Sequence, residues 1–167
     1  ATGPYVADAY DTRGIARSDK ADCLRAITDV NVAIAYSAKH KAPAVRQLNY
    51  QYHVSAAYVH LNCAGDFDAA LAVLDRASRL KPAEPAAFAG RALMYSEKGD
   101  FKSAHVEMAK ALTLGHDNPT RAYVLAARGV ILQREGRLDE SMSDLDQAIG
   151  LNPAYASSYA ERGTVWR

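Results

Sequence analysis

The 167-residue chain is poor in cysteine, with two, and it lacks any long uninterrupted apolar run. Two cysteines are too few for a disulfide-rich scaffold. No apolar stretch approaches the roughly 20 residues that a membrane-spanning helix needs, so we expect no membrane span. The formal net charge is only +1 and the sequence has no stripe of lysine and arginine. We therefore expect no nucleic-acid partner.

Sequence motifs for catalysis are also missing. There is no Gly-rich phosphate loop, no Gly-x-Ser-x-Gly and no His-Glu-x-x-His. His53 and His60 are seven residues apart, which in a helix separates the imidazoles by about 10 Å, too far to share a metal ion. His60 and Cys63 lie within one helical turn, but a cysteine–histidine nucleophile pair needs an orienting third group, and none is apparent. We expect no enzyme and no catalytic, cofactor-binding or metal-binding residue.

What the sequence does contain is a repeated helical pattern, clearest between Ala122 and Pro153. Apolar or small residues recur there at intervals of three and four on both sides of Gly136, which is the spacing of one helix face. The glycine gives the backbone the freedom that a tight turn needs, and the proline cannot continue a helix. This stretch is predicted to be a helix hairpin.

The same unit occurs at least three times. Gly65, Gly99 and Gly136 are separated by 34 and 37 residues. Three further sets of positions keep the same two intervals, namely Ala77, Ala111 and Ala148; Leu80, Leu114 and Leu151; and Leu74, Met108 and Leu145. Fixed intervals at several positions indicate a repeat architecture, in which neighbouring hairpins stack to bury their apolar faces.

These features resemble the tetratricopeptide repeat family. That family has a 34-residue helix–turn–helix unit, small residues where the two helices touch, a Gly-Asp/Asn-aromatic turn and a closing proline. The small contacts here would be Ala92 with Ala104 and Gly129 with Ser141. The resemblance implies an all-α fold, a right-handed superhelical solenoid of antiparallel helix hairpins with about nine helices.

We expect one domain over residues 1–167. Its parts are a divergent first repeat at 7–40, an insertion at 41–50, repeats at 51–84, 85–121 and 122–155, and a capping helix at 156–167. The turn of the first repeat is Ala21-Asp22-Cys23. Because proline suits the first turn of a helix, the insertion is expected to lengthen the next helix, from near Pro43 to Cys63; an irregular link is the alternative.

Three side-chain arrangements follow from stacking antiparallel helices. Tyr58 stands where the family has a small residue, so it needs space that Ala70 would provide. Two ion pairs are expected between repeats, Glu107 with Arg128 and Asp144 with Arg162, unless the arginines keep their charged heads in water.

Cys23 begins one predicted helix and Cys63 ends another, which places them close together. They form either a disulfide, which requires an oxidising compartment, or two buried free thiols. A bridged chain would be periplasmic or secreted, and an unbridged one cytoplasmic.

In this family the first helices line a concave surface that commonly binds peptides. The resemblance therefore implies a small, apolar, aromatic-edged groove for a peptide or helix of a partner protein. The positions that hold a C-terminal carboxylate in some members are here Asp8, Asp11, Ala56, Ala86 and Gly90, which cannot make that clamp. The alternative function is a self-assembly scaffold, a homo-oligomer formed through the groove or the terminal helices. The expected groove residues are Tyr52, Ser55, Val59, Asn62, Ala89, Leu93, Tyr123, Ala126, Val130 and Gln133.

Overall fold

The computed structural model describes residues 5–40 and 43–165, with the backbone alone for residues 43–47. Within these residues it contains nine α-helices and no strand, which confirms the predicted all-α helical repeat. The helices group into two compact units, Ala1–Pro82 and Ala83–Arg167, and each unit is treated by itself below.

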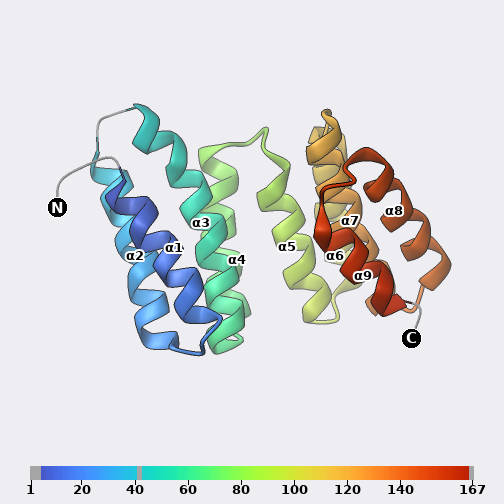
Figure 1. Ribbon diagram of the computed structural model, residues 1–167, viewed down its shortest axis with the longest axis horizontal. Coiled ribbons are helices and arrows are strands. Elements are labelled where there is room, and N and C mark those ends of the chain that lie inside the picture. The colour runs from blue at the N-terminus through green and yellow to red at the C-terminus, as the bar shows by residue number, and fades with distance from the viewer. Residues whose placement is uncertain (1–4, 41–42, 166–167) are drawn as a thin grey trace. The chain divides into compact units, whose positions relative to one another are not determined.

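The first unit has two helix hairpins (Figure 1). Its core includes Ala26, Val30, Ala56 and Val59, which are fully buried and pack in one cluster. The long first helix of the second hairpin packs against three neighbours, so it forms the centre of this unit. The helices are α1 (Val6–Ser18), α2 (Cys23–Lys39), α3 (Pro43–Ala64) and α4 (Phe67–Leu80).

The second unit has two hairpins followed by a single helix (Figure 1). Two buried clusters hold it together: one joins its first two helices to the third, and the other joins the third to the fourth. The small size of most core residues, chiefly alanine, allows the helices to pack closely. The helices are α5 (Pro85–Glu97), α6 (Phe101–Leu114), α7 (Asn118–Arg134), α8 (Leu138–Leu151) and α9 (Ala156–Val165).

The predicted turn glycines occupy equivalent bends. Gly65, Gly99 and Gly136 have φ angles of +58°, +77° and +81°, the left-handed region that only glycine enters without steric cost. The fourth such bend, in the divergent first repeat, is made by Ala21 with φ +59°. The alignment of Ala21-Asp22-Cys23 with the Gly-Asp-Phe turns is therefore confirmed, and the alanine carries a strain that the glycines avoid.

The aspartate after the glycine caps the next helix. Asp66 accepts a hydrogen bond from the backbone N–H of Ala69 at 3.0 Å, and Asp100 accepts one from Ser103 at 3.1 Å. Such a cap satisfies one of the N–H groups that a helix start leaves unpaired. The Gly-Asp-Phe sequence thus ends one helix and begins the next within three residues.

In two hairpins the first helix contacts the second at a glycine. A Cβ atom at Gly129 would lie 3.0 Å from the Leu145 side chain, and one at Gly14 would lie 2.8 Å from Val30. The Ser141 hydroxyl donates a 2.8 Å hydrogen bond to the backbone carbonyl of Gly129. The predicted Gly129–Ser141 contact is therefore confirmed, and a larger residue at position 129 would require the Leu145 side chain to shift.

The insertion does lengthen a helix, because α3 runs from Pro43 to Ala64; the predicted residues 41–42 lie outside the described part of the chain. The expectation for Tyr58 is wrong. Its side chain is 45% exposed and its hydroxyl donates to Asp19 at 3.0 Å, whereas Ala57 is buried instead. The reason is that α3 has one more helical residue before its turn than α5 has. The helix α3 ends directly before Gly65, whereas α5 ends two residues before Gly99. One extra residue turns the helix by about 100°.

Cys23, at the start of α2, and Cys63, near the end of α3, form a disulfide with Cα atoms 5.0 Å apart. The bridged alternative from the sequence is the one that the structure has. It closes a loop between residues 40 positions apart. It ties the first hairpin to the second at the end of α3 that leads into the Gly65 turn.

Replacing Ala21 by glycine is expected to stabilise the chain by roughly 0.5–1 kcal/mol, because it removes the strain of a positive φ angle at a residue with a Cβ. Urea unfolding measures the difference. The matched control is Ala9→Gly, at an exposed position inside α1, where the same chemical change is expected to destabilise by about 1 kcal/mol. Equal signs for the two variants would contradict the assignment of the bend.

The double variant Cys23→Ser/Cys63→Ser is expected to lose roughly 2–4 kcal/mol of unfolding free energy, since a disulfide restricts the unfolded chain. The free energy of unfolding of wild type in a reducing agent should equal that of this variant. The reducing agent should not change the free energy of unfolding of the variant. A mass that does not change when the denatured wild type is reduced would show that the bridge is absent.

Candidate functional site

Arg91 and Arg128 each pair with an acid of their own hairpin. Arg91 Nε lies 3.3 Å from Glu107 Oε2, and Arg128 Nε lies 2.6 Å from Asp144 Oδ2. The predicted pairs Glu107–Arg128 and Asp144–Arg162 are therefore wrong. In each observed pair the arginine lies eight residues before the turn residue with positive φ, and the acid lies eight residues after it. The two side chains therefore face each other across the hairpin.

The first hairpin has the same arrangement. Asp29 is almost fully buried and receives two hydrogen bonds from Arg13, at 2.7 and 2.8 Å, and one from Arg17 at 2.6 Å. The hydrogen bonds from Arg13 hold the pKa of Asp29 below its usual range, against the opposing effect of burial. A buried carboxylate of this kind depends on its cation, because losing one partner leaves an unpaired charge inside the protein.

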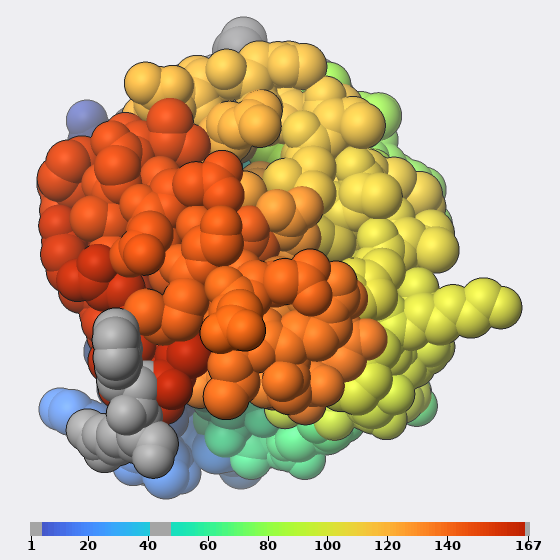
Figure 2. All heavy atoms as spheres, turned by 90° about the vertical axis from the view of Figure 1, so that its right-hand side faces the viewer, coloured from blue at the N-terminus to red at the C-terminus, as the bar shows by residue number. Residues whose placement is uncertain are grey.

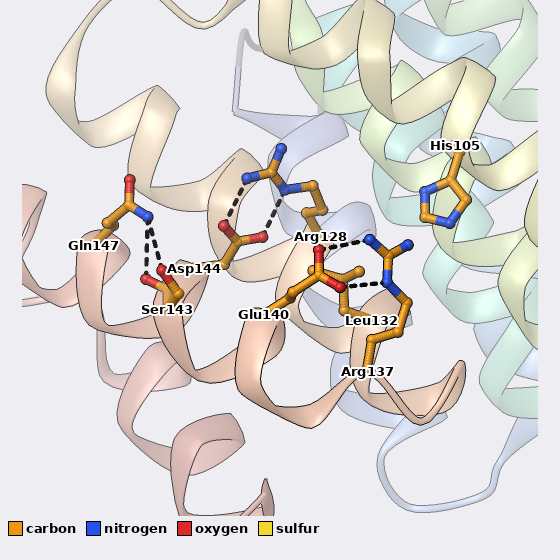
Figure 3. Close-up of a pocket in the computed structure, with 8 residues that line it drawn as sticks. All are labelled: His105, Arg128, Leu132, Arg137, Glu140, Ser143, Asp144 and Gln147. Atoms are coloured by element: carbon orange, nitrogen blue, oxygen red, sulfur yellow. Dashed lines mark hydrogen bonds and ion pairs between the residues drawn. The ribbon is translucent and has the colours of Figure 1, made fainter.

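A hollow of about 340 Å³ lies over α6, α7 and α8 in the second unit (Figure 3). Its charged groups are mutually satisfied: Arg128 pairs with Asp144, and Arg137 with Glu140 at 2.6 Å. His105 faces it from α6 and lies 2.9 Å from Glu135. Since each of these charges already has an opposite partner, the hollow offers no free charge to a ligand. The lining residues are His105, Arg128, Leu132, Arg137, Glu140, Ser143, Asp144 and Gln147.

Of the groove residues predicted in the first unit, three are buried. Val59 belongs to the core, and Tyr52 and Ser55 face α1, where they donate hydrogen bonds to Asp8 at 2.6 Å and to Asp11 at 3.1 Å. Asn62 is exposed. Tyr52 therefore covers its neighbouring helix, α1.

Asp8 and Asp11 give the contact between α1 and α3 an acidic character. Asp11 is 8% exposed, and its Oδ1 atom has no hydrogen-bond partner in the described residues. Burial raises the pKa of Asp11 to about 6, the bond from Ser55 opposes this shift and the charge of Asp8 adds to it. Burial and the bond to Asp8 also raise the pKa of Tyr52. A carboxylate ligand would meet two acidic residues here.

In the second unit the predicted residues separate into two groups. Ala89 and Ala126 are buried between helices, whereas Leu93, Tyr123, Val130 and Gln133 are half-buried on α5 and α7. Leu93 and Tyr123 pack against the same buried cluster, so α5 and α7 present them together. The half-buried four are called the α5/α7 surface below.

Tyr155 was not among the predicted residues, yet its ring lies 6.4 Å from that of Tyr123 in an edge-to-face arrangement. Burial raises the pKa of Tyr123 to about 12, so its hydroxyl stays protonated at neutral pH. Gln133 donates a 2.9 Å hydrogen bond to Thr164 of α9. The α5/α7 surface is thus bordered by an aromatic pair at one end and by α9 at the other.

No helix in the described part of the chain is long and apolar enough to cross a bilayer. The same residues include no group of three or more histidine, cysteine and acidic side chains that could hold a metal ion together.

Comparison with known proteins gives one family. The family model described as "Tetratricopeptide repeat" matches residues 122–155, which contain most of α7 and all of α8. "Tetratricopeptide repeat protein 13" of Homo sapiens is 33% identical over 118 residues, a match that covers 68% of this chain and 13% of that protein. The chain thus spans a small part of this relative's length.

Solved structures share the fold at low sequence identity. A tetratricopeptide repeat protein from Parabacteroides merdae has a TM-score of 0.59 and 17% identity, over 96% of this chain and 59% of that one. The first TPR of Spaghetti (RPAP3), bound to the HSP90 peptide SRMEEVD, has a TM-score of 0.54 and 18% identity, over 70% of this chain and 90% of that one.

The buried Asp11 predicts a pH dependence. Its folded-state pKa of about 6 lies above the unfolded value of about 3.9, so the folded state binds the proton more tightly. Its contribution to stability is complete below about pH 4 and is lost as the pH rises through 6. Relative to Asp11→Asn, the free energy of unfolding of wild type should fall by roughly 2 kcal/mol between pH 4 and 7.5.

Urea unfolding at several pH values measures this difference. The matched control is Asp139→Asn, an exposed aspartate on α8, whose curve should run nearly parallel to wild type. Parallel curves for wild type and Asp11→Asn would show that Asp11 titrates normally.

Proposed function

Because the chain belongs to the tetratricopeptide repeat family, we propose that it is a non-enzymatic protein-interaction module that binds a peptide or helix of a partner protein. The α5/α7 surface is the binding site. The observation that supports it is the pairing of half-buried Leu93 and Tyr123 on two adjacent helices, backed by one buried cluster. Such a surface is apolar and rigid, which suits an apolar segment.

The residues of this chain at the positions that bind a carboxylate in some family members argue against an acidic ligand. The RPAP3 complex holds the acidic peptide SRMEEVD. In this chain Asp8 and Asp11 occupy two of the corresponding positions and already accept hydrogen bonds from Tyr52 and Ser55. These carboxylates repel an acidic tail from the first unit, and the half-buried apolar side chains of the α5/α7 surface suit an apolar segment with aliphatic or aromatic anchors.

Tyrosine suits this role because its ring provides a large contact area and loses little conformational freedom on binding. Tyr123 is further held by Tyr155 and by its packing on the core of the unit. Val130 extends the apolar strip along α7, and Gln133 supplies a polar edge beside Thr164. The site therefore contacts two or three turns of a bound helix or a short extended peptide.

The test is panning of a random peptide library on the immobilised chain, followed by affinity measurements on the enriched peptides. Enriched sequences are expected to carry aromatic or aliphatic anchors without a preference for an acidic C-terminus. The double variant Leu93→Ala/Tyr123→Ala should weaken binding by about tenfold or more, because truncation of buried anchors typically costs 1–2 kcal/mol each.

Val106→Ala is the matched control, since Val106 is an exposed apolar residue on α6 and its loss should leave affinity unchanged. Circular dichroism confirms that each variant is folded. Peptides that bind the double variant as well as wild type would place the binding site elsewhere.

A further inference from the structure

Asp11 differs from the other buried acidic residues of the described chain. Asp29, Glu107 and Asp144 are almost fully buried, and each pairs with an arginine. Asp11 is only 8% exposed, but no ion pair of the described residues includes it. Its Oδ2 atom accepts a hydrogen bond from Ser55, and its Oδ1 atom has no partner among these residues. A buried carboxylate is normally paired with a cation, so this one lacks its opposite charge.

A second carboxylate lies one helical turn before Asp11 on α1. Asp8 is half-buried and accepts a 2.6 Å hydrogen bond from Tyr52 of α3, just as Asp11 accepts a 3.1 Å bond from Ser55. Both bonds join residues 44 positions apart, so α1 and α3 run in the same direction where they lie side by side (Figure 1). A hydroxyl donates one hydrogen bond and carries no charge. The two negative charges, called the Asp8/Asp11 pair below, are therefore not neutralised by α3.

The described side chains of the two helices supply no cation to this pair. The two arginines of α1, Arg13 and Arg17, both bind Asp29 of α2, at 2.7 and 2.6 Å. The described side chains of α3, residues 48–64, include no lysine or arginine. The pair lies between two helices of the described chain, so its position does not depend on where the sequence begins or ends.

The charge of Asp11 disfavours the folded state. Burial raises the pKa of Asp11 to about 6, and the charge of Asp8 adds to this shift. At neutral pH the Asp11 carboxylate is therefore mostly ionised, although its surroundings oppose the charge. A cation placed beside the pair relieves this opposition, so its binding is favoured by charge complementarity.

We propose that the Asp8/Asp11 pair binds an arginine side chain of a partner peptide. Arginine is the cation that this chain itself pairs with its other buried acids. Its planar guanidinium has five N–H donors, which suit two carboxylates better than the three donors of lysine. The guanidinium bonds to the half-buried Asp8 and gives Asp11 an opposite charge. This site lies in the first unit and is separate from the α5/α7 surface of the second.

The probe is N-acetyl-arginine amide, and NMR chemical shifts of the intact chain measure its binding at low salt and about pH 7.5, where Asp11 is mostly ionised. Saturable shifts are expected at the backbone amides of Asp8, Asp11 and Ser55. N-acetyl-citrulline amide has nearly the same shape without the charge, and it should bind about tenfold more weakly or less. This comparison uses wild type alone, so it does not depend on whether a variant folds.

The double variant Asp8→Asn/Asp11→Asn keeps the size of both side chains and removes their charges. It should weaken binding of the arginine probe by about tenfold or more, because a hydrogen bond to a charged group is lost. The matched control is Asp139→Asn, which removes an exposed aspartate and should bind as wild type does. It lies on α8, which Figure 2 shows in orange at the surface toward the viewer.

Equal affinities of wild type for the arginine and citrulline probes would overturn the proposal, because the charge would then play no part. So would equal affinities of wild type and Asp8→Asn/Asp11→Asn for the arginine probe. The probe carries no aromatic or branched aliphatic anchor for the α5/α7 surface. Its result therefore tests this site alone, and the peptide panning described above tests the other.

Discussion

The close approach of two helices at a residue with little or no side chain is the contact on which each hairpin depends. At Gly129 the backbone of α7 meets the side chain of Leu145, and the Ser141 hydroxyl bonds to the carbonyl of Gly129. Interiors packed at this density do not absorb an added methyl group without movement. The position of the second helix is thus fixed by the first, and its apolar face is then available to the next hairpin.

The arginine–acid pairs act on the same contact. Asp29, Glu107 and Asp144 are almost fully buried, and the arginines that pair with them lie next to the small residues in sequence. A buried ion pair adds little net stability, but a slipped helix would leave a buried carboxylate unpaired. The pairs therefore discourage alternative registers. The α3–α4 hairpin lacks such a pair and has instead the disulfide at the end of α3.

Function in this fold depends on which side chains the scaffold presents. In the first unit, α1 presents Asp8 and Asp11, and these accept hydrogen bonds from Tyr52 and Ser55 of α3. The second unit offers apolar side chains on α5 and α7 instead. The proposed ligand class rests on these side chains and not on the shared backbone.

The sequence by itself determined the helices and their turns. Glycine spacing, the Gly-Asp-Phe turns and the prolines are local signals, so the bends at Gly65, Gly99 and Gly136, and also at Ala21, could be predicted. The pairing of Cys23 with Cys63 also followed from antiparallel order, though the sequence left its oxidation state open.

Only the tertiary structure decided which side chains face inward. A single extra residue at the end of α3 turned Tyr58 outward, because each residue rotates a helix by about 100°. The acid that faces Arg128 could belong to the hairpin of Arg128 or to the preceding hairpin, and helical periodicity is compatible with both. Three-dimensional packing chose Asp144, since two residues equally distant from the turn lie opposite each other across it.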